Sequence, residues 1–455
     1  MKPDTFLKSL IWLYAVLLIF EGALRKWVLP GYSDALLVVR DPVVILIYLV
    51  AMARGRFPLN GWVITTAGLA VASVVAALLA GQDNLLITAY GLRSNFLHLP
   101  LIWVMAATFD RRDTERLGQA LLLLAIPMTL LMVLQFKAPI DSPLNRGVGL
   151  DDTGGQLYGA LGHIRPPGFF SFITGPNLFY PLVTAVLFHQ FKAERRLRWW
   201  LLVACGLAVL LALPVSISRT AMVAALVVAS AYGLSLFFTG LFNAALLRLL
   251  AVGALVVIAI GFLPVFDDAR EAFLSRWDTA TQADEVGVDA VTGRVFGGGD
   301  YLADVLNRAT LFGKGVGMGS NVAARLTTGR MGFLLAENEW AKCLLELGLP
   351  LGLAFLGLRF SLALGLLRRA FSRLRTQRDP LPWLLWSAST LPLISGQWAQ
   401  PTSLGFATLG AGLCLAACQD EPDEEEEEET EEEDTEEGAV EPPREGGAPA
   451  ADTAP

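Results

Sequence analysis

The chain has 455 residues, of which 54% are hydrophobic and only 17% are charged, and its mean hydropathy is +0.51. Soluble domains carry roughly 25% charged residues, so this composition excludes an ordinary soluble enzyme. The formal net charge of −8 combines two parts of opposite sign, because residues 420–455 carry −17 and the preceding 419 residues carry +9. Four cysteines without paired spacing and three histidines predict neither a disulfide framework nor a metal centre.

Apolar segments of close to 20 residues recur along residues 1–419, and each is long enough to cross a hydrocarbon core of about 30 Å. The sequence therefore predicts an all-α, polytopic membrane bundle of about twelve transmembrane helices. The predicted spans are Phe6–Phe20, Ala35–Met52, Gly61–Ala80, Tyr90–Phe109, Leu117–Phe136, Ile173–Phe191, Leu197–Val215, Ala221–Phe238, Ala244–Phe266, Trp340–Leu358, Leu381–Trp398 and Thr402–Ala417.

The loops between these spans differ in charge. Arg and Lys gather in alternate loops, at residues 54–56, 111–116, 192–198 and 368–378, whereas the short loops at residues 82–83 and 396–401 have none. By the positive-inside rule, both termini are expected in the cytoplasm. Two long loops, residues 137–172 and 267–339, are then extracytoplasmic, and the second is expected to be partly helical. Residues 420–455, rich in Glu, are expected to form a disordered acidic cytoplasmic tail.

Two features at the outer ends of the spans have both a structural and a functional interpretation. Gly313–Gly319 lacks the spacing of a nucleotide-binding loop, so it is either a bend or a set of backbone amides offered to an anionic head group. Arg219 follows Ser216-Ile-Ser at a very short junction, where it either extends to the interface or faces the bundle and holds a phosphate.

A third feature begins the tenth span. Glu337, Asn338 and Glu339 either cap the helix or supply a carboxylate base at the membrane surface. Capping accounts readily for one of the two acids, and less well for both of them together with the asparagine.

Several motifs together resemble the O-antigen ligase and O-antigen polymerase superfamily of bacterial polysaccharide assembly. The similarity covers about residues 160–360, and its motifs keep the family's order. They are Arg165-Pro-Pro-Gly168 with Pro176-Asn177, Ser216-Ile-Ser-Arg219, Thr292-Gly-Arg294 with Leu311–Gly317, and Glu337-Asn338-Glu339-Trp340 with Glu346–Gly352. Ligases of this family carry His before the Asn, where this chain has Glu337. This difference favours polymerisation or a related glycan transfer over ligation.

The resemblance implies an enzyme that acts on a polyprenyl-diphosphate-linked glycan at the outer face of the bacterial inner membrane. An acceptor hydroxyl displaces the lipid diphosphate with inversion, and the enzyme needs neither a nucleotide nor a metal. Arg219 and Arg294 are expected to stabilise the leaving diphosphate, with Arg165 as a further ligand, because guanidinium groups bind phosphate oxygens bidentately. Glu337 takes the position of the base, and Asn338 and Glu339 contact the substrate.

The rival interpretation is a transporter, either a flippase for lipid-linked oligosaccharide or a carrier of another small solute. Twelve spans with both ends inside suit both classes. A transporter often has several charges in the middle of its spans, and here Arg40-Asp41 and Arg93 with His98 are the exceptions to their absence; they are interpreted as contacts between neighbouring helices or interface residues. The expected partners are the lipid-linked glycan, membrane lipid and other polysaccharide-assembly proteins, and no nucleic acid.

Overall fold

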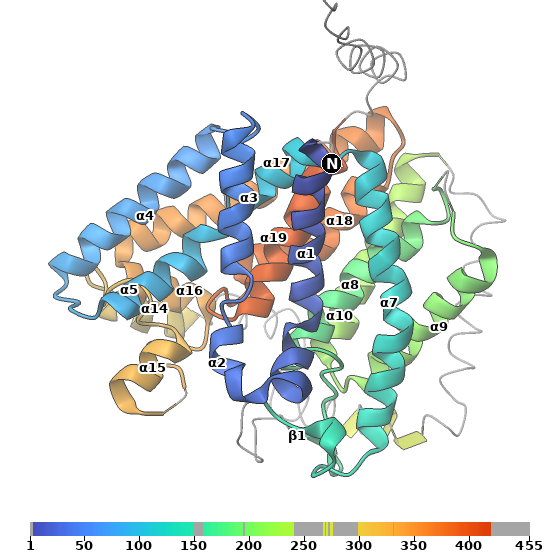
Figure 1. Cartoon of the computed structure of the whole chain (residues 1–455), viewed down its shortest axis with the longest axis horizontal. Helices are drawn as coiled ribbons and strands as arrows, with labels where there is room; N and C mark the ends of the chain where they lie inside the picture. Colours follow the sequence, from blue (N-terminus) through green and yellow to red (C-terminus); the bar gives the residue numbers. More distant parts are fainter. Residues whose placement is uncertain are drawn as a thin grey trace, which may run out of the picture. The chain divides into compact units, whose positions relative to one another are not determined.

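The computed structural model describes residues 3–148, 158–193, 196–240, 267–268, 270–271, 274–275, 299–330 and 332–419. These residues belong to one unit, which ends at Gln419, and they are mostly helical. The predicted span Ala244–Phe266, the predicted phosphate ligand Arg294 and the acidic tail lie outside the described residues. The all-α membrane character predicted from the sequence is confirmed at this coarse level, since several long apolar helices make up the fold (Figure 1).

The first part of the chain is a series of helices. They are α1 (Pro3–Ala23), η1 (Leu24–Val28), η2 (Pro30–Tyr32), α2 (Ser33–Leu36), α3 (Asp41–Ala53), α4 (Gly61–Leu79), α5 (Leu85–Leu92), η3 (Arg93–Leu97), α6 (Leu101–Thr108) and α7 (Arg111–Lys137). A short turn, η4 (Pro143–Asn145), and the antiparallel strands β1 (Tyr158–Ala160) and β2 (His163–Ile164) follow.

The second part returns to helices. They are α8 (Thr174–His189), α9 (Trp199–Val215), α10 (Arg219–Phe238), α14 (Gly299–Arg308), α15 (Asn321–Thr328), α16 (Glu339–Leu347), α17 (Leu349–Thr376), α18 (Leu381–Ser395) and α19 (Pro401–Ala416). Side-chain caps fix several starts. Asn60, Ser218 and Asn338 each accept a hydrogen bond from a backbone N–H of the first helical turn.

Five described helices are long and apolar enough to cross a membrane, and a sixth span results if the pair at residues 30–36 and 41–53, bent by 43°, counts as one. The five are Thr5–Val28, Gly61–Leu79, Arg111–Lys137, Arg219–Phe238 and Leu349–Thr376. Two shorter apolar helices are Trp199–Val215 and Pro401–Ala416. The described residues thus confirm a membrane-type helical fold, and the count of twelve stays a prediction.

One predicted span has the wrong bounds. Trp340–Leu358 was expected to be continuous, but the chain breaks at Gly348, whose φ of +83° ends α16 and precedes Pro350 in the first turn of α17. Glycine takes this backbone conformation without steric cost, and proline suits a helix start. The long apolar helix therefore runs from Leu349 to Thr376, and the arginines at 368, 369, 373 and 375 belong to its last turns rather than to a loop.

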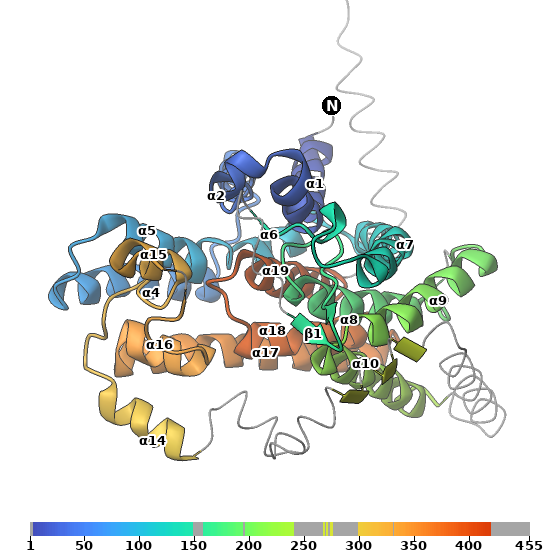
Figure 2. The same cartoon turned by 90° about the horizontal axis from the view of Figure 1, so that it is seen from below.

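Helix α19 lies in the middle of the bundle, with α18 on one side and α6 on another (Figures 1 and 2). Residues 403–416 are all buried, as expected of a helix that is apolar all round. Glycines allow neighbours to come close. A Cβ at Gly405 would lie 2.2 Å from the Arg40 guanidinium, and one at Gly412 would lie 2.6 Å from Met105 Sδ. The core of the fold is therefore built around a helix with little side-chain volume.

Candidate functional site

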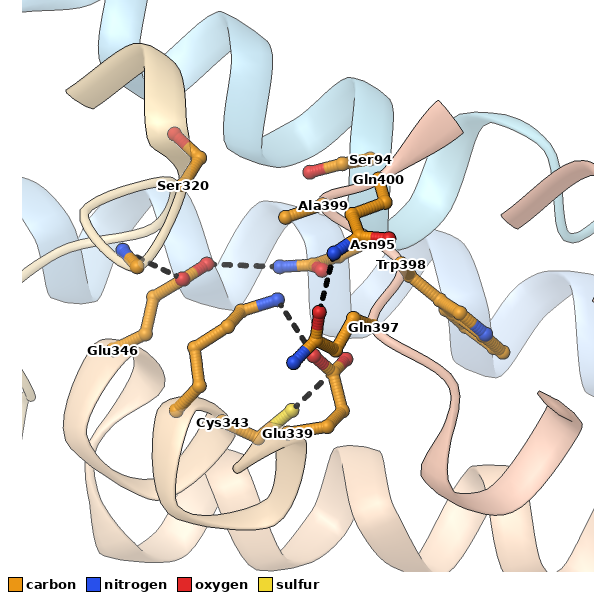
Figure 3. Close-up of polar contacts among 12 residues, drawn as sticks. Ser94, Asn95, Ser320, Glu339, Cys343, Glu346, Gln397, Trp398, Ala399 and Gln400 are labelled. Atoms are coloured by element: carbon orange, nitrogen blue, oxygen red, sulfur yellow. Dashed lines mark hydrogen bonds and ion pairs between the residues drawn. The ribbon is translucent and has the colours of Figure 1, made fainter. Parts of the chain in front are cut away.

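A small polar crevice lies where the helix pair α15 and α16 meets the segment between α18 and α19. Its volume is only about 20 Å³, which is room for about one water molecule. Its walls come from four stretches of the chain, namely Gly319 and Asn321, Phe333 to Glu337, Glu339 and Lys342, and Gln397 to Gln400. The site contains three residues that the sequence singled out, because Asn338 lies between the lining residues Glu337 and Glu339. Figure 3 shows side chains of α16 directed towards Asn95 and the glutamines.

Glu339 forms the floor of the crevice and is paired with two cations. Its carboxylate accepts hydrogen bonds from Arg359 Nη1 at 2.7 Å and from Lys342 Nζ at 3.1 Å, and all three side chains are almost fully buried. Arg359 also donates to the carbonyls of Leu393 and Gly396 at 2.8 Å, and its guanidinium lies 3.8 Å from the ring centroid of Trp398. Glu339 therefore joins α16 to α17 and α18, and its carboxylate is already engaged.

The glycine loop before α15 is closed by a carboxylate of the same chain. Glu346, at the end of α16, accepts the N–H of Gly317 at 2.8 Å and that of Gly319 at 3.0 Å, one on each oxygen. Asn95 Nδ2 donates to the first of these oxygens at 3.0 Å (Figure 3). The backbone amides that could have received an anionic head group are thus occupied by Glu346, which favours the structural interpretation of this loop.

Glycine is required at Gly317 for two reasons. Its φ is +92°, and a Cβ there would lie 2.1 Å from the carbonyl oxygen of Ile87. Gly91 makes the reciprocal approach, because a Cβ on it would lie 2.3 Å from the nitrogen of Gly317. The loop consequently lies against the backbone of α5, and Gln82 Nε2 fixes it further by donating to the carbonyl of Val316 at 3.1 Å.

Glu337 and Asn338 have different roles. Asn338 is the N-cap of α16, since its side-chain oxygen accepts the N–H groups of Trp340 at 2.9 Å and Ala341 at 3.2 Å. Glu337 is exposed and lines the crevice, and its backbone carbonyl accepts Gln397 Nε2 at 2.6 Å. The capping interpretation therefore holds for Asn338, while Glu337 is an exposed acid among the lining residues.

The two predicted arginines that the structure describes, Arg165 and Arg219, are not among the residues that line this crevice. Arg219 is the first residue of α10, directly after the cap Ser218, and is partly exposed. Arg165 follows β2 and is partly buried, with an Nε that has no hydrogen-bond partner in the described part of the chain. The Gly168 carbonyl that ends this motif accepts Lys26 Nζ at 2.8 Å. Among the described residues, the lining of this crevice therefore contains the predicted base but neither Arg165 nor Arg219.

The charged groups within the first spans form a buried network. Asp41 accepts hydrogen bonds from Arg93 Nε at 2.6 Å and pairs with His98 Nε2 at 3.0 Å, while His98 Nδ1 lies 3.1 Å from the Tyr14 hydroxyl. Arg40 donates to the same hydroxyl at 3.3 Å, and its Nε lies 3.4 Å from Glu21. The interpretation as contacts between neighbouring helices agrees with this arrangement, which extends over α1, α3 and η3.

Sequence reasoning missed Arg359, Gln397 and Gln400. Arg359 had a usable signal, because it is the one charge between Leu349 and Leu367, and an ionisable residue inside an apolar helix usually has a buried partner. The glutamines had no such signal. Gln400 Nε2 donates to Gln397 Oε1, and both place amide groups opposite Glu337 only because α18 ends beside α16.

The mouth of this crevice offers hydrogen-bonding groups to a neutral polyhydroxylated group that lies over it, since the space inside holds about one water molecule. The four buried charges of Glu339, Lys342, Arg359 and Glu346 balance, and Glu337 is the exposed member of the charged residues that line the crevice. Amides donate and accept hydrogen bonds, and a carboxylate accepts them, so together they can satisfy hydroxyl groups. Within the described residues, no three His, Cys, Asp or Glu side chains are grouped to hold a metal ion.

Comparison with known proteins adds nothing to the resemblance to the O-antigen ligase and polymerase superfamily, which rests on the motifs alone. No family model matches the chain, and no curated protein is significantly similar to it.

Proposed function

We propose that this chain transfers or polymerises polyprenyl-diphosphate-linked glycan at the outer face of the bacterial inner membrane. The acceptor hydroxyl oxygen attacks the anomeric carbon, the bond from that carbon to the diphosphate oxygen breaks, and the configuration inverts. The lipid diphosphate leaves with the bonding electrons, and the hydroxyl proton passes to a carboxylate. In this proposal, both termini are cytoplasmic, about twelve helices span the membrane, and the outer loops 137–172 and 267–339 surround the site.

The crevice at Glu337 is the observation that carries the proposal. Glu337 is exposed and lines the crevice together with Asn321, Gln397 and Gln400. Phe333, also exposed, adds an aromatic face. Sugar hydroxyls need this mixture of donors and acceptors, and the carboxylate can accept the proton of an attacking hydroxyl. The sequence predicted that Glu339 contacts the substrate. In this proposal, Glu339 instead positions α16 through Lys342 and Arg359.

In this proposal, the diphosphate is bound by arginine side chains. Arg219 and Arg294 are the proposed ligands, with Arg165 as a third, because a planar guanidinium matches phosphate oxygens and stays charged. The leaving diphosphate gains negative charge as the bond breaks, so these cations lower the barrier. The engagement of Gly317 and Gly319 by Glu346 adds support, since it leaves arginine side chains as the available anion ligands.

The test is polymer formation from lipid-linked glycan in membranes, with protein amount checked by immunoblot. Glu337→Gln keeps the shape but removes the basicity, so we expect turnover to fall with little change in binding of the lipid-linked substrate. Glu271→Gln, which neutralises another exposed acid in the same outer region, is the matched control. Full activity of Glu337→Ala would refute the role of this carboxylate.

Two further variants test the resemblance itself. Glu337→His should retain part of the activity, because His occupies this position in the ligases. Arg219→Lys and Arg294→Lys should be nearly as damaging as the alanine variants, because the charge remains but the bidentate geometry is lost. Loss of one such donor costs about 2.7–4 kcal/mol, or roughly 10²–10³ in rate.

A second candidate function is transport, and the buried network around Asp41 favours it. Ionisable groups that are buried between membrane helices commonly mark ion or substrate pathways. A transporter would lose substrate movement in Asp41→Asn while keeping its fold, whereas the glycan transferase would lose thermal stability and activity together. Measuring both properties in reconstituted vesicles separates the two candidates.

A further inference from the structure

A second and larger crevice lies at the opposite ends of the helices. It is open to the outside and has a volume of about 830 Å³. Four elements meet there, namely the start of α4 with the residues before it, the end of α6, the part of α17 between Ala354 and Arg369, and the end of α19. Its lining residues are Pro58, Asn60, Gly61, Trp62, Thr65, Trp103, Ala106, Ala107, Ala354, Leu358, Ser361, Arg369, Leu415 and Gln419.

The wall of this crevice is apolar and aromatic. Trp62 and Trp103 stack with their ring centroids 6.1 Å apart and an interplanar angle of 21°. Leu358 and Leu415 extend the apolar wall. Trp62 also reaches α17, where a Cβ at Gly365 would lie 3.6 Å from its ring. Tryptophan favours the membrane–water interface, where one side of the ring is apolar and the other is wet.

The rim of the crevice is basic. Arg369 is exposed and lines it, and Arg56 Nη1 lies 3.5 Å from the carbonyl of the lining residue Ala107. The outward faces of the two flanking helices are apolar, with Ile64 exposed on α4 and Phe360 on α17. The crevice therefore continues from a surface suited to acyl chains to a pair of arginines.

We propose that this crevice binds an anionic glycerophospholipid of the leaflet at the basic end of the bundle. The phosphate lies at Arg369 and Arg56, and one acyl chain follows Trp62 and Leu358. Charge complementarity selects an anionic head group, because each arginine near a membrane surface contributes about 1 kcal/mol towards anionic lipid. This site is remote from Glu337, so the inference does not depend on the proposed glycan transfer.

The acidic tail is the other occupant to test, since it begins directly after the lining residue Gln419. Its 18 acidic residues complement the arginines, but it has almost no large apolar side chains to cover Trp62, Leu358 and Leu415. A phospholipid satisfies both the basic rim and the apolar wall. The lipid is therefore the occupant that the lining residues favour.

The experiment uses the full-length protein in nanodiscs made of phosphatidylglycerol and phosphatidylcholine. Native mass spectrometry measures retained lipid, and a photoactivatable phosphatidylglycerol maps its contacts. We expect retention of phosphatidylglycerol and cross-links to residues 58–65 and 354–369. Arg369→Gln should lower retention about fivefold, whereas the control Arg368→Gln, an adjacent exposed arginine outside the crevice, should not.

Two variants fill the crevice instead of changing its charge. Thr65→Trp and Ser361→Trp add volume at exposed lining positions and should reduce retention of both lipids. Thermal unfolding of each variant confirms that the fold is kept. Equal loss in Arg368→Gln and Arg369→Gln would reduce the effect to general surface charge and overturn the proposal. Retention by both folded tryptophan variants would also overturn it, as would lipid binding that begins only after removal of residues 420–455.

Discussion

Replacing Glu346 tests whether an internal carboxylate holds the glycine loop. Its side chain is 1% exposed and receives three hydrogen bonds, from the N–H groups of Gly317 and Gly319 and from Asn95 Nδ2. Glu346→Gln keeps the volume but supplies one acceptor oxygen instead of two. If that oxygen remains on Gly317, the new NH₂ group faces the N–H of Gly319. One charge-assisted bond is then replaced by two opposed donors.

The magnitude follows from these contacts. A hydrogen bond to a charged group contributes about 1.5–3 kcal/mol, and a buried donor left without an acceptor costs about 1–3 kcal/mol. Both contributions describe the same N–H of Gly319, so they are not simply added. We therefore expect Glu346→Gln to lower the free energy of unfolding by about 3 kcal/mol. Glu346→Ala leaves three donors unpaired and should cost more than Glu346→Gln.

The assay is reversible unfolding in mixed micelles, together with amide hydrogen exchange of residues 313–320. Exchange at Gly317 and Gly319 should accelerate in Glu346→Gln, which a general loss of stability elsewhere in the bundle would not produce selectively. Glu337→Gln is the matched control, because it removes an exposed acid just before the same helix and should leave both readouts unchanged. Wild-type stability and wild-type exchange in Glu346→Gln would refute the assignment of the loop to Glu346.

Three other predictions concern the fold. Glu339→Gln removes the buried negative charge that pairs with Lys342 and Arg359, so it should lower the free energy of unfolding by about 3–5 kcal/mol. An effect below about 1 kcal/mol in the same micelle assay would contradict the pairing. Gly91→Ala should lower the free energy of unfolding by about 1–3 kcal/mol, because the added Cβ meets the Gly317 backbone. The control Gly68→Ala on α4 adds a Cβ in open space and should be neutral or stabilise the fold by up to about 1 kcal/mol. Equal effects of the two variants would argue against the close approach. Of two cysteines placed at the exposed positions Thr328 and Thr376, only the one at 328 should be labelled from outside the cell. The background should be low because the four native cysteines are buried. Labelling of the cysteine at 376 in intact cells would contradict the proposed topology.

The helical membrane character could be predicted because it depends on local composition. Long apolar segments give helices whatever their neighbours, and polar caps such as Asn60 and Ser218 lie directly before two of them. The bounds of the tenth span were wrong because hydropathy does not register a left-handed glycine. Gly348 followed by Pro350 was the available signal, and it marks a helix boundary more reliably than the hydropathy of its neighbours.

The candidate site could be predicted only in part, because its contacts join distant residues. Glu337 was singled out by its place before the helix and by the family resemblance, and its role stays a prediction. The pairing of Glu346 with Asn95, in contrast, spans 251 positions and that with Gly317 spans 29. One sequence contains no record of such pairs. Glu339 illustrates the consequence, since an acid at a helix start has the same local pattern whether it caps, pairs with Arg359 or contacts a substrate.

The occupation of the glycine loop by Glu346 constrains how the proposed reaction is divided over the molecule. An anionic diphosphate would be repelled by Glu337 and finds no open backbone amides at Gly317 or Gly319, so the crevice suits a neutral acceptor sugar better than the donor. The donor must then be held by arginines such as Arg219. Variants of Glu337 and of Arg219 should consequently differ in which substrate concentration affects their rate. Glu337→Gln should change the dependence on acceptor concentration, and Arg219→Lys the dependence on donor, so a common effect of both variants on one substrate alone would argue against two separate subsites.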